Sequence, residues 1–148
     1  MLEVLCYLLL IAPKAHHREQ LADLLWGESD SLNARKHLRQ AVWQLQTELI
    51  TLAGPEAGAL LRIDNEWLQV DADAPWWTDA RELRDVHDRV RNRRGADLGA
   101  ADVAAMRDAV ALYQGELLEG WYQDWCIHER ERYRAMRLAL LEKLLRQQ

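Results

Sequence analysis

The chain has 148 residues, the length of one average domain or two small lobes, which excludes a large multidomain machine. Apolar residues make up 49% and charged residues 29%, which excludes disorder, collagen-like repeats and a disulfide scaffold. The formal net charge is −5, from 19 basic and 24 acidic side chains, and this sum by itself argues against a nucleic-acid-binding domain, which is normally basic.

The first apolar segment, Val4 to Ala12, predicts a core helix. It is about half as long as the ~20 residues that a membrane helix needs. The acid at Glu3 and the poor cleavage region around Pro13 argue against a signal peptide. The two cysteines, Cys6 and Cys126, are too few for a disulfide framework, and we expect both to be small buried hydrophobes. A cytoplasmic protein with no membrane partner is the expectation.

Two helices joined by a tight turn follow. Residues 18–26 repeat apolar residues at helical spacing and stop at Gly27, with His17 as a candidate cap at the start. Asp30 or Ser31 can cap the next helix, which we expect from about Asn33 to Ile50. Its apolar residues lie on one stripe: Leu38, Ala41, Val42, Leu45 and Leu49.

A β-hairpin is expected at residues 60–71, after the Gly54-Pro55 loop. Apolar and polar residues alternate on both sides of a turn at Asp64-Asn65-Glu66. The element order is that of a winged helix-turn-helix: a short helix, a second helix, a longer third helix and a hairpin.

The pattern becomes wholly helical after Asp71, so we divide the chain into lobes at residues 1–71 and 72–148. The second lobe contains three apolar periodic segments, around Val86, Val110 and Leu140, and the second of these extends to Leu117. Paired helices of this size resemble units of a helical repeat of the tetratricopeptide type. The expected fold class is therefore mainly α, with a winged helix-turn-helix lobe followed by an all-α lobe.

The outer face of the helix at 33–50 is the strongest candidate site. No acidic residue occurs between Ser31 and Thr47, and the residue types opposite the apolar stripe are those that read base edges or bind phosphates. A solvated helix face is the alternative, and an exposed Trp43 favours a contact surface. The face comprises Arg35, Lys36, Arg39, Gln40, Trp43, Gln44 and Thr47.

Other clusters carry weaker indications. Four arginines between Arg89 and Arg94 suit phosphates, an acidic partner or a small ligand, but a solvated loop with helix-end cations is the preferred interpretation. Cys126 and His128 are too few for a metal site, and Trp121 and Trp125, four residues apart, are expected to pack a helix pair together. Glycine-rich phosphate loops and the common hydrolase and metalloprotease motifs are absent, so we expect no enzyme and no cofactor.

Two sequence blocks resemble a known family. The segments HREQLADLLW at 17–26 and NARKHLRQAV at 33–42 are similar to the DNA-binding half of SARP-type bacterial regulators. The segments ALYQGELL at 111–118 and DWCIHERER at 124–132 are similar to the bacterial transcriptional activator domain that follows it. The second block is the more specific, and together the blocks span most of the chain.

The resemblance implies a transcription regulator that binds double-stranded DNA. The third helix would enter the major groove, and the hairpin, with Arg62 and Asn65, would touch the flanking backbone or minor groove. The helical lobe would support a homodimer or contact RNA polymerase.

The chain departs from the family in three ways. Gln44, Gln46 and Thr47 replace an arginine-rich run, which weakens phosphate contacts. An opening antiparallel sheet is not indicated before the first helix. The helical domain normally continues beyond the position of Gln148, which implies a fragment or a remnant of a larger regulator.

The alternative is a protein-interaction or dimerisation module whose degenerate winged helix no longer binds DNA. The charge of −5 and the depleted arginines favour it. However, three of the six basic residues before Asp71 lie between Ser31 and Thr47 with no acid among them, so the total charge conceals a local basic face. Most Trp side chains are expected in the core and between helices, with Trp43 as the exception.

Overall fold

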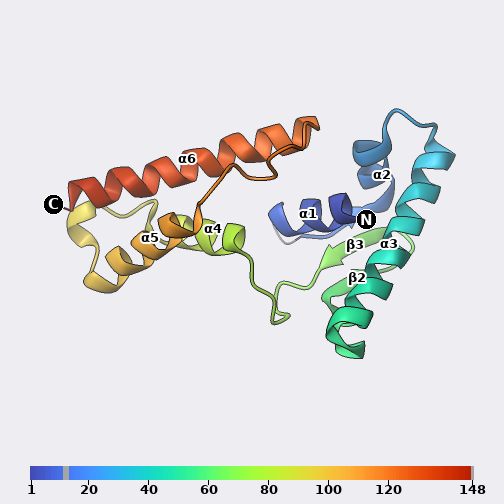
Figure 1. The fold of residues 1–148 in the computed structure, drawn as a ribbon, viewed down its shortest axis with the longest axis horizontal. Coiled ribbons are helices and arrows are strands. Elements are labelled where there is room, and N and C mark those ends of the chain that lie inside the picture. The colour runs from blue at the N-terminus through green and yellow to red at the C-terminus, as the bar shows by residue number, and fades with distance from the viewer. Residues whose placement is uncertain (12–13, 148) are drawn as a thin grey trace. The chain divides into compact units, whose positions relative to one another are not determined.

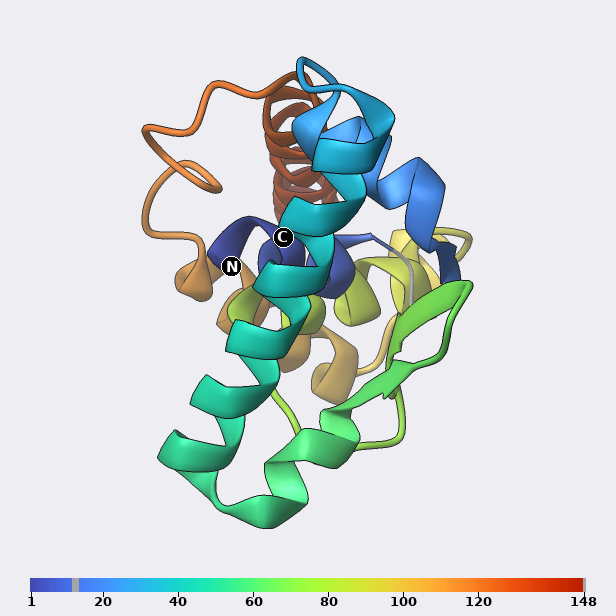
Figure 2. The same cartoon turned by 90° about the vertical axis from the view of Figure 1, so that its right-hand side faces the viewer.

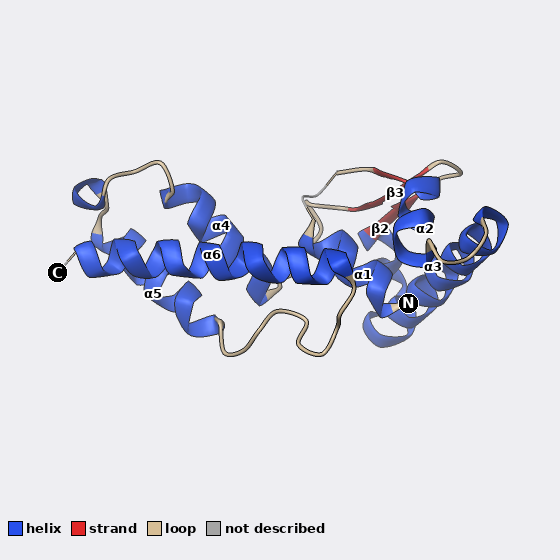
Figure 3. Cartoon of the chain, turned by 90° about the horizontal axis from the view of Figure 1, so that it is seen from above, coloured by secondary structure: helices blue, strands red, loops and turns tan. Residues whose placement is uncertain are grey.

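The structure, a computed structural model, describes residues 1–11 and 14–147, and the chain forms two compact units, Met1–Pro75 and Trp76–Gln148 (Figure 1). Ala12, the last residue of the predicted first helix, and Pro13 lie outside the described residues. Strands are drawn only in the first unit, as Figure 3 shows, and the predicted mainly helical fold is confirmed. Within the described residues, no helix is both long and apolar enough to cross a membrane.

Among its described residues the first unit contains four helices and a small sheet. The strands follow the order β1-β3-β2, and both pairings are antiparallel. In chain order the elements are α1 (Leu2–Leu10), β1 (His16–His17), α2 (Arg18–Trp26), α3 (Ser31–Ala53), the 3₁₀ helix η1 (Pro55–Leu60), β2 (Leu61–Ile63) and β3 (Trp67–Val70).

Strand β1 adds a third strand to the two-stranded hairpin that we expected, and it replaces the expected His17 cap on α2. His16 pairs with Leu68 and His17 with Trp67. His17 does occupy the position before α2, yet its side chain makes no capping hydrogen bond. The unpaired edge of β3 offers backbone partners to any extended segment, so two polar residues become a strand without an apolar pattern of their own.

Helix α3 is longer than predicted at both ends. It begins at Ser31 because the Asp30 carboxylate accepts a hydrogen bond from the backbone N–H of Asn33 at 2.8 Å. It ends at Gly54, whose φ of +91° suits glycine. The next residues form η1 rather than the expected loop, since Pro55 at the first position has a helical φ. Figure 2 shows α3 leading through this turn into the hairpin.

Apolar residues from the helices and strands close the first core. The predicted stripe of α3 is confirmed at Leu38, Ala41, Val42 and Leu45, which are buried, while Leu49 is partly exposed. Val4 and Leu8 of α1, Leu21 of α2 and Leu68 of β3 complete this core. The outer face of α3 is thereby fixed on the solvent side.

The second unit consists of α4 (Asp79–Val90), the 3₁₀ helix η2 (Gly95–Asp97), α5 (Ala100–Leu112) and α6 (Asp124–Arg146). Its three α-helices pack on one another (Figure 1). The second segment was expected to extend to Leu117, but α5 ends at Leu112. Trp121 precedes α6, and Trp125 lies in its first turn, so the two Trp side chains lie on different segments.

Arg130 explains the loop between α5 and α6. Its guanidinium donates hydrogen bonds of 2.7–2.8 Å to the backbone carbonyls of Leu117, Leu118 and Trp121. Leu118 has a φ of +50°, which a leucine rarely adopts. These three bonds hold a segment that the sequence periodicity assigns to a helix.

The aromatic residues of the core also differ from expectation. No Trp is buried, which contradicts the prediction for most of them; Tyr133, at 1% exposure, is the largest fully buried side chain. Cys126 is buried as expected, but Cys6 is only partly buried. That partial burial raises the pKa of the Cys6 thiol.

Candidate functional site

All seven residues predicted on the outer face of α3 are exposed. Trp43 is 69% exposed, as expected for a contact surface rather than a core residue. The face comprises Arg35, Lys36, Arg39, Gln40, Trp43, Gln44 and Thr47. It presents three cations, two amides, a hydroxyl and an indole to solvent.

The charge on this face is reduced by one residue from the neighbouring helix. The Glu19 carboxylate of α2 forms an ion pair with the Arg35 guanidinium, and both side chains are about half exposed. In the part of the chain that the structure describes, Lys36 and Arg39 form no ion pair. The acid-free segment of α3 therefore has the Glu19 carboxylate beside it, which the sequence did not indicate because Glu19 lies on the preceding helix.

A pocket of about 300 Å³ joins α3 to α2 and the hairpin. Its lining side chains are polar or charged except for Leu38, which is 1% exposed and lies at its floor. The lining residues are Arg18, Glu19, Arg35, Leu38, Arg39 and Asn65. The structure thus brings together three of the predicted residues, Arg35, Arg39 and Asn65, with Arg18 and Glu19, which the sequence reasoning missed. No local sequence pattern connects position 18 with positions 39 and 65. The one signal that could have pointed to Arg18 as a site residue was its basic side chain at the first position of a helix.

Arg18 is positioned by the hairpin turn. Its backbone N–H donates to the carbonyl of Glu66 at 2.8 Å, and its guanidinium donates to the carbonyl of Asp64 at 3.1 Å. The Asp64 carboxylate in turn accepts from the backbone N–H groups of Trp67 and Glu66. These two hydrogen bonds, with a smaller contribution from the Arg18 charge, lower the pKa of Asp64. The turn that forms this wall of the pocket is therefore held in place by hydrogen bonds.

The two predicted hairpin residues are not brought together. Asn65 lies at the turn and lines the pocket, whereas Arg62 lies on β2 and forms an ion pair with Asp71 at 3.3 Å. Arg62 borders a separate depression with Trp67 and Gln69. Only Asn65 extends the α3 surface.

The arginine cluster at 89–94 serves the fold of the second unit. Arg93 forms an ion pair with Asp102 at 2.9 Å and donates to the carbonyl of Asp97, and Arg89 lies 3.6 Å from the same Asp102 carboxylate. Arg91 and Arg94 are exposed. Half of the cluster is thus occupied by structural partners, in line with the preferred interpretation.

Cys126 and His128 do not form a pair. Cys126 is fully buried and its thiol lies 3.6 Å from the Gln123 side-chain oxygen, while His128 is exposed. The described residues contain no group of three or more side chains suited to hold a metal ion.

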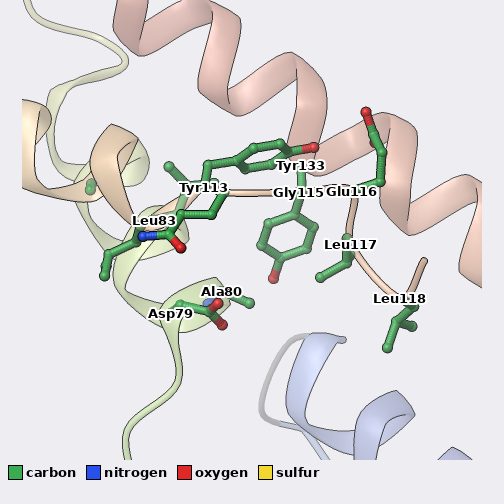
Figure 4. A pocket seen from close by; sticks show the side chains of 12 residues that line it. Asp79, Ala80, Leu83, Tyr113, Gly115, Glu116, Leu117, Leu118 and Tyr133 are labelled. Atoms are coloured by element: carbon green, nitrogen blue, oxygen red, sulfur yellow. The ribbon is translucent and has the colours of Figure 1, made fainter.

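A second pocket, of about 420 Å³, lies within the helical unit. Its lining is mostly apolar, with Tyr113 and Tyr133 beside Leu83, Leu117 and Leu118 (Figure 4). Burial and then the negative charge of Glu116 raise the pKa of Tyr113. No sequence pattern indicated this pocket, because the loop carrying Leu117 and Leu118 is shaped by Arg130.

Comparisons with known proteins bear on the second unit alone. Residues 78–148 match the family model described as bacterial transcriptional activator domain. The match begins at Thr78, whose hydroxyl caps α4 by accepting from the backbone N–H of Arg81. This family is a regulatory domain rather than a class of enzymes. No curated protein and no solved structure matches the chain.

Proposed function

We propose that this protein is a DNA-binding transcriptional regulator, with α3 as its major-groove recognition helix and the hairpin as its wing. The observation that carries the proposal is the outer face of α3, where seven exposed polar and aromatic residues continue to Asn65 through a pocket bordered by three arginines. The match to a bacterial transcriptional activator domain in the second unit supports a role in transcription.

The arrangement of the first unit supports the winged-helix interpretation. Helices α2 and α3 are joined by a short turn at 27–30, and the three-stranded sheet follows α3 through its last two strands. In helix-turn-helix proteins the second helix of this pair enters the major groove and the first crosses the backbone. The apolar stripe of α3 faces the core, so the polar face is the one available to DNA.

The side chains on that face have the required chemistry. Arginine and lysine bind phosphates or guanine edges, and the amides of Gln40 and Gln44 can pair with adenine. The cations are few, so the proposed binding is weak and strongly dependent on salt. We propose that the second unit supports a homodimer or contacts RNA polymerase.

A titration of the full chain with short duplex DNA, selected from a random-sequence pool, tests the proposal. Affinity should fall steeply across a salt series, because each phosphate contact releases counterions. Arg39→Ala should weaken binding by about 1–3 kcal/mol with an unchanged circular dichroism spectrum. Arg107→Ala is the matched control, since Arg107 is an exposed arginine of α5 with no ion pair among the described residues. Absence of binding to any duplex at low salt would contradict the proposal.

One observation favours a protein-interaction module instead. Ile127, Leu138 and Leu145 of α6 are 41%, 54% and 69% exposed and lie about three and then two helical turns apart, so they share one face of the helix, with the Arg134–Glu131 ion pair between the first two. Light scattering over a concentration series tests this alternative: the wild-type chain should self-associate and Leu138→Ser should not. A monomer at every concentration would count against self-association through this face.

A further inference from the structure

The pocket between α2, α3 and the hairpin turn has the composition of an anion site. Arg18, Arg35 and Arg39 border it with the Asn65 amide, and Glu19 is the sole acid in its lining. Guanidinium groups bind phosphate oxygens through paired N–H donors. Several guanidinium groups around one cavity suit a phosphate, whose oxygens accept more than one such pair of hydrogen bonds.

The three arginines are held to different degrees. Arg18 is fixed to the hairpin turn through its bond to the Asp64 carbonyl. Arg35 is engaged by Glu19, and Arg39 makes no ion pair or side-chain hydrogen bond among the described residues. An anionic ligand in the pocket would therefore contact three different cations. Arg18 is held in place, Arg39 has no ion pair among the described residues, and Arg35 is already paired with a carboxylate.

We infer that this pocket binds a backbone phosphate of duplex DNA, and that the Glu19 carboxylate competes with that phosphate for Arg35. The inference rests on the proposed function and adds Glu19 as a residue that weakens DNA binding. An ion pair between half-exposed side chains contributes little free energy, so a phosphate can displace Glu19 from Arg35. The displaced carboxylate stays beside the phosphate and repels it.

Removing the Glu19 carboxylate from the pocket should therefore strengthen DNA binding more than removing a negative charge elsewhere on the protein. Glu19→Gln should tighten duplex binding about fivefold at low salt, the size expected when one like-charge repulsion is removed at an exposed site. The slope of log affinity against log salt should steepen by about 0.9, because the pocket then faces the DNA with one more net positive charge. Glu19→Ala should act in the same direction, which separates loss of charge from a new amide contact.

The experiment titrates the full chain and its variants with one duplex over a salt series. Glu56→Gln is the matched control, since Glu56 is exposed on η1 outside the pocket and loses the same charge. The double variant Glu19→Gln/Arg35→Ala should lose the gain, because the cation that Glu19 restrains is gone. Melting temperatures confirm that each variant folds.

The outcomes separate the inference from the proposed function. If the wild type binds DNA but Glu19→Gln and Glu56→Gln show equal affinity and slope, the inference is overturned and the proposed function stands. If no variant binds DNA at low salt, both fall. A thermal-shift series with inorganic phosphate distinguishes the source: a response of Glu19→Gln to free phosphate without tighter DNA binding overturns the assignment to the DNA backbone.

Discussion

The second unit contains 13 of the 19 basic residues and the first contains six, yet the exposed polar face of α3 belongs to the first. In the second unit Arg130 binds three backbone carbonyls, Arg93 binds Asp102, and Arg84 is buried at 7% exposure. In the first unit Lys36 and Arg39 face solvent without an ion pair among the described residues. The comparison shows that the density of arginine in a sequence does not tell which arginines stay unpaired, because acids and carbonyls that the fold places nearby engage part of them, while Arg91, Arg94 and Arg107 of the second unit remain exposed.

The largest expected effect tests the structural use of arginine. Arg130→Ala removes three hydrogen bonds to partly buried carbonyls, and we expect it to lower the free energy of unfolding by about 2–3 kcal/mol. Chemical denaturation followed by circular dichroism measures the loss. Arg107→Ala, with the same change of charge on an exposed site of the same unit, should cost less than about 0.5 kcal/mol. Equal stability of the two variants would break the comparison.

A smaller effect is expected at Asp102. Asp102→Asn weakens the ion pairs with Arg93 and Arg89, and the free energy of unfolding should fall by about 1–2 kcal/mol. The same variant releases two arginines of the second unit, neither of which lines the α3 pocket. Its DNA affinity should therefore follow the control Glu56→Gln; a gain as large as that expected for Glu19→Gln would show that free arginines anywhere suffice.

The smallest effect concerns the hairpin turn and pH. The pKa of Asp64 is lowered by hydrogen bonds from the backbone N–H groups of Trp67 and Glu66. A lowered folded-state pKa means that this stabilisation is fully present above the ordinary value of 3.8 and is lost as pH falls through the lowered value. As pH falls from 3.8 through the lowered pKa, the free energy of unfolding should thus decline less steeply for Asp64→Asn than for the wild type. Identical pH profiles would show that the turn does not depend on the carboxylate.

The fold followed from the sequence where the signals were local. The Gly27 stop shows this best, because a Cβ there would lie 2.5 Å from the Asp23 carbonyl oxygen. The Asp30 cap and the apolar stripe of α3 are equally local; together these signals located α2 and α3, although α3 extends beyond its predicted range at both ends. Strand β1 and the loop before α6 were missed because each depends on distant partners: β3 for His16 and His17, and Arg130 for Leu118.

The candidate site divides in the same way. The exposed face of α3 could be predicted because side chains about 100° apart on a helix define its two sides. The contribution of Arg18 and the opposing Glu19 could not, since the first is directed by the Asp64 carbonyl and the second pairs across two helices. The DNA-binding role of the whole surface stays a prediction.

Thr47 contributes more than a polar position on α3. Its hydroxyl proton is donated to the backbone carbonyl of Trp43 at 2.9 Å, just as Thr51 donates to the carbonyl of Thr47 at 2.8 Å. The Thr47 oxygen therefore has only lone pairs to offer outward. In the proposed groove orientation it would suit the amino groups of adenine or cytosine and disfavour the carbonyl oxygens of guanine and thymine. If α3 reads DNA as proposed, this hydrogen bond within the helix would set a preference between bases at one position of the DNA.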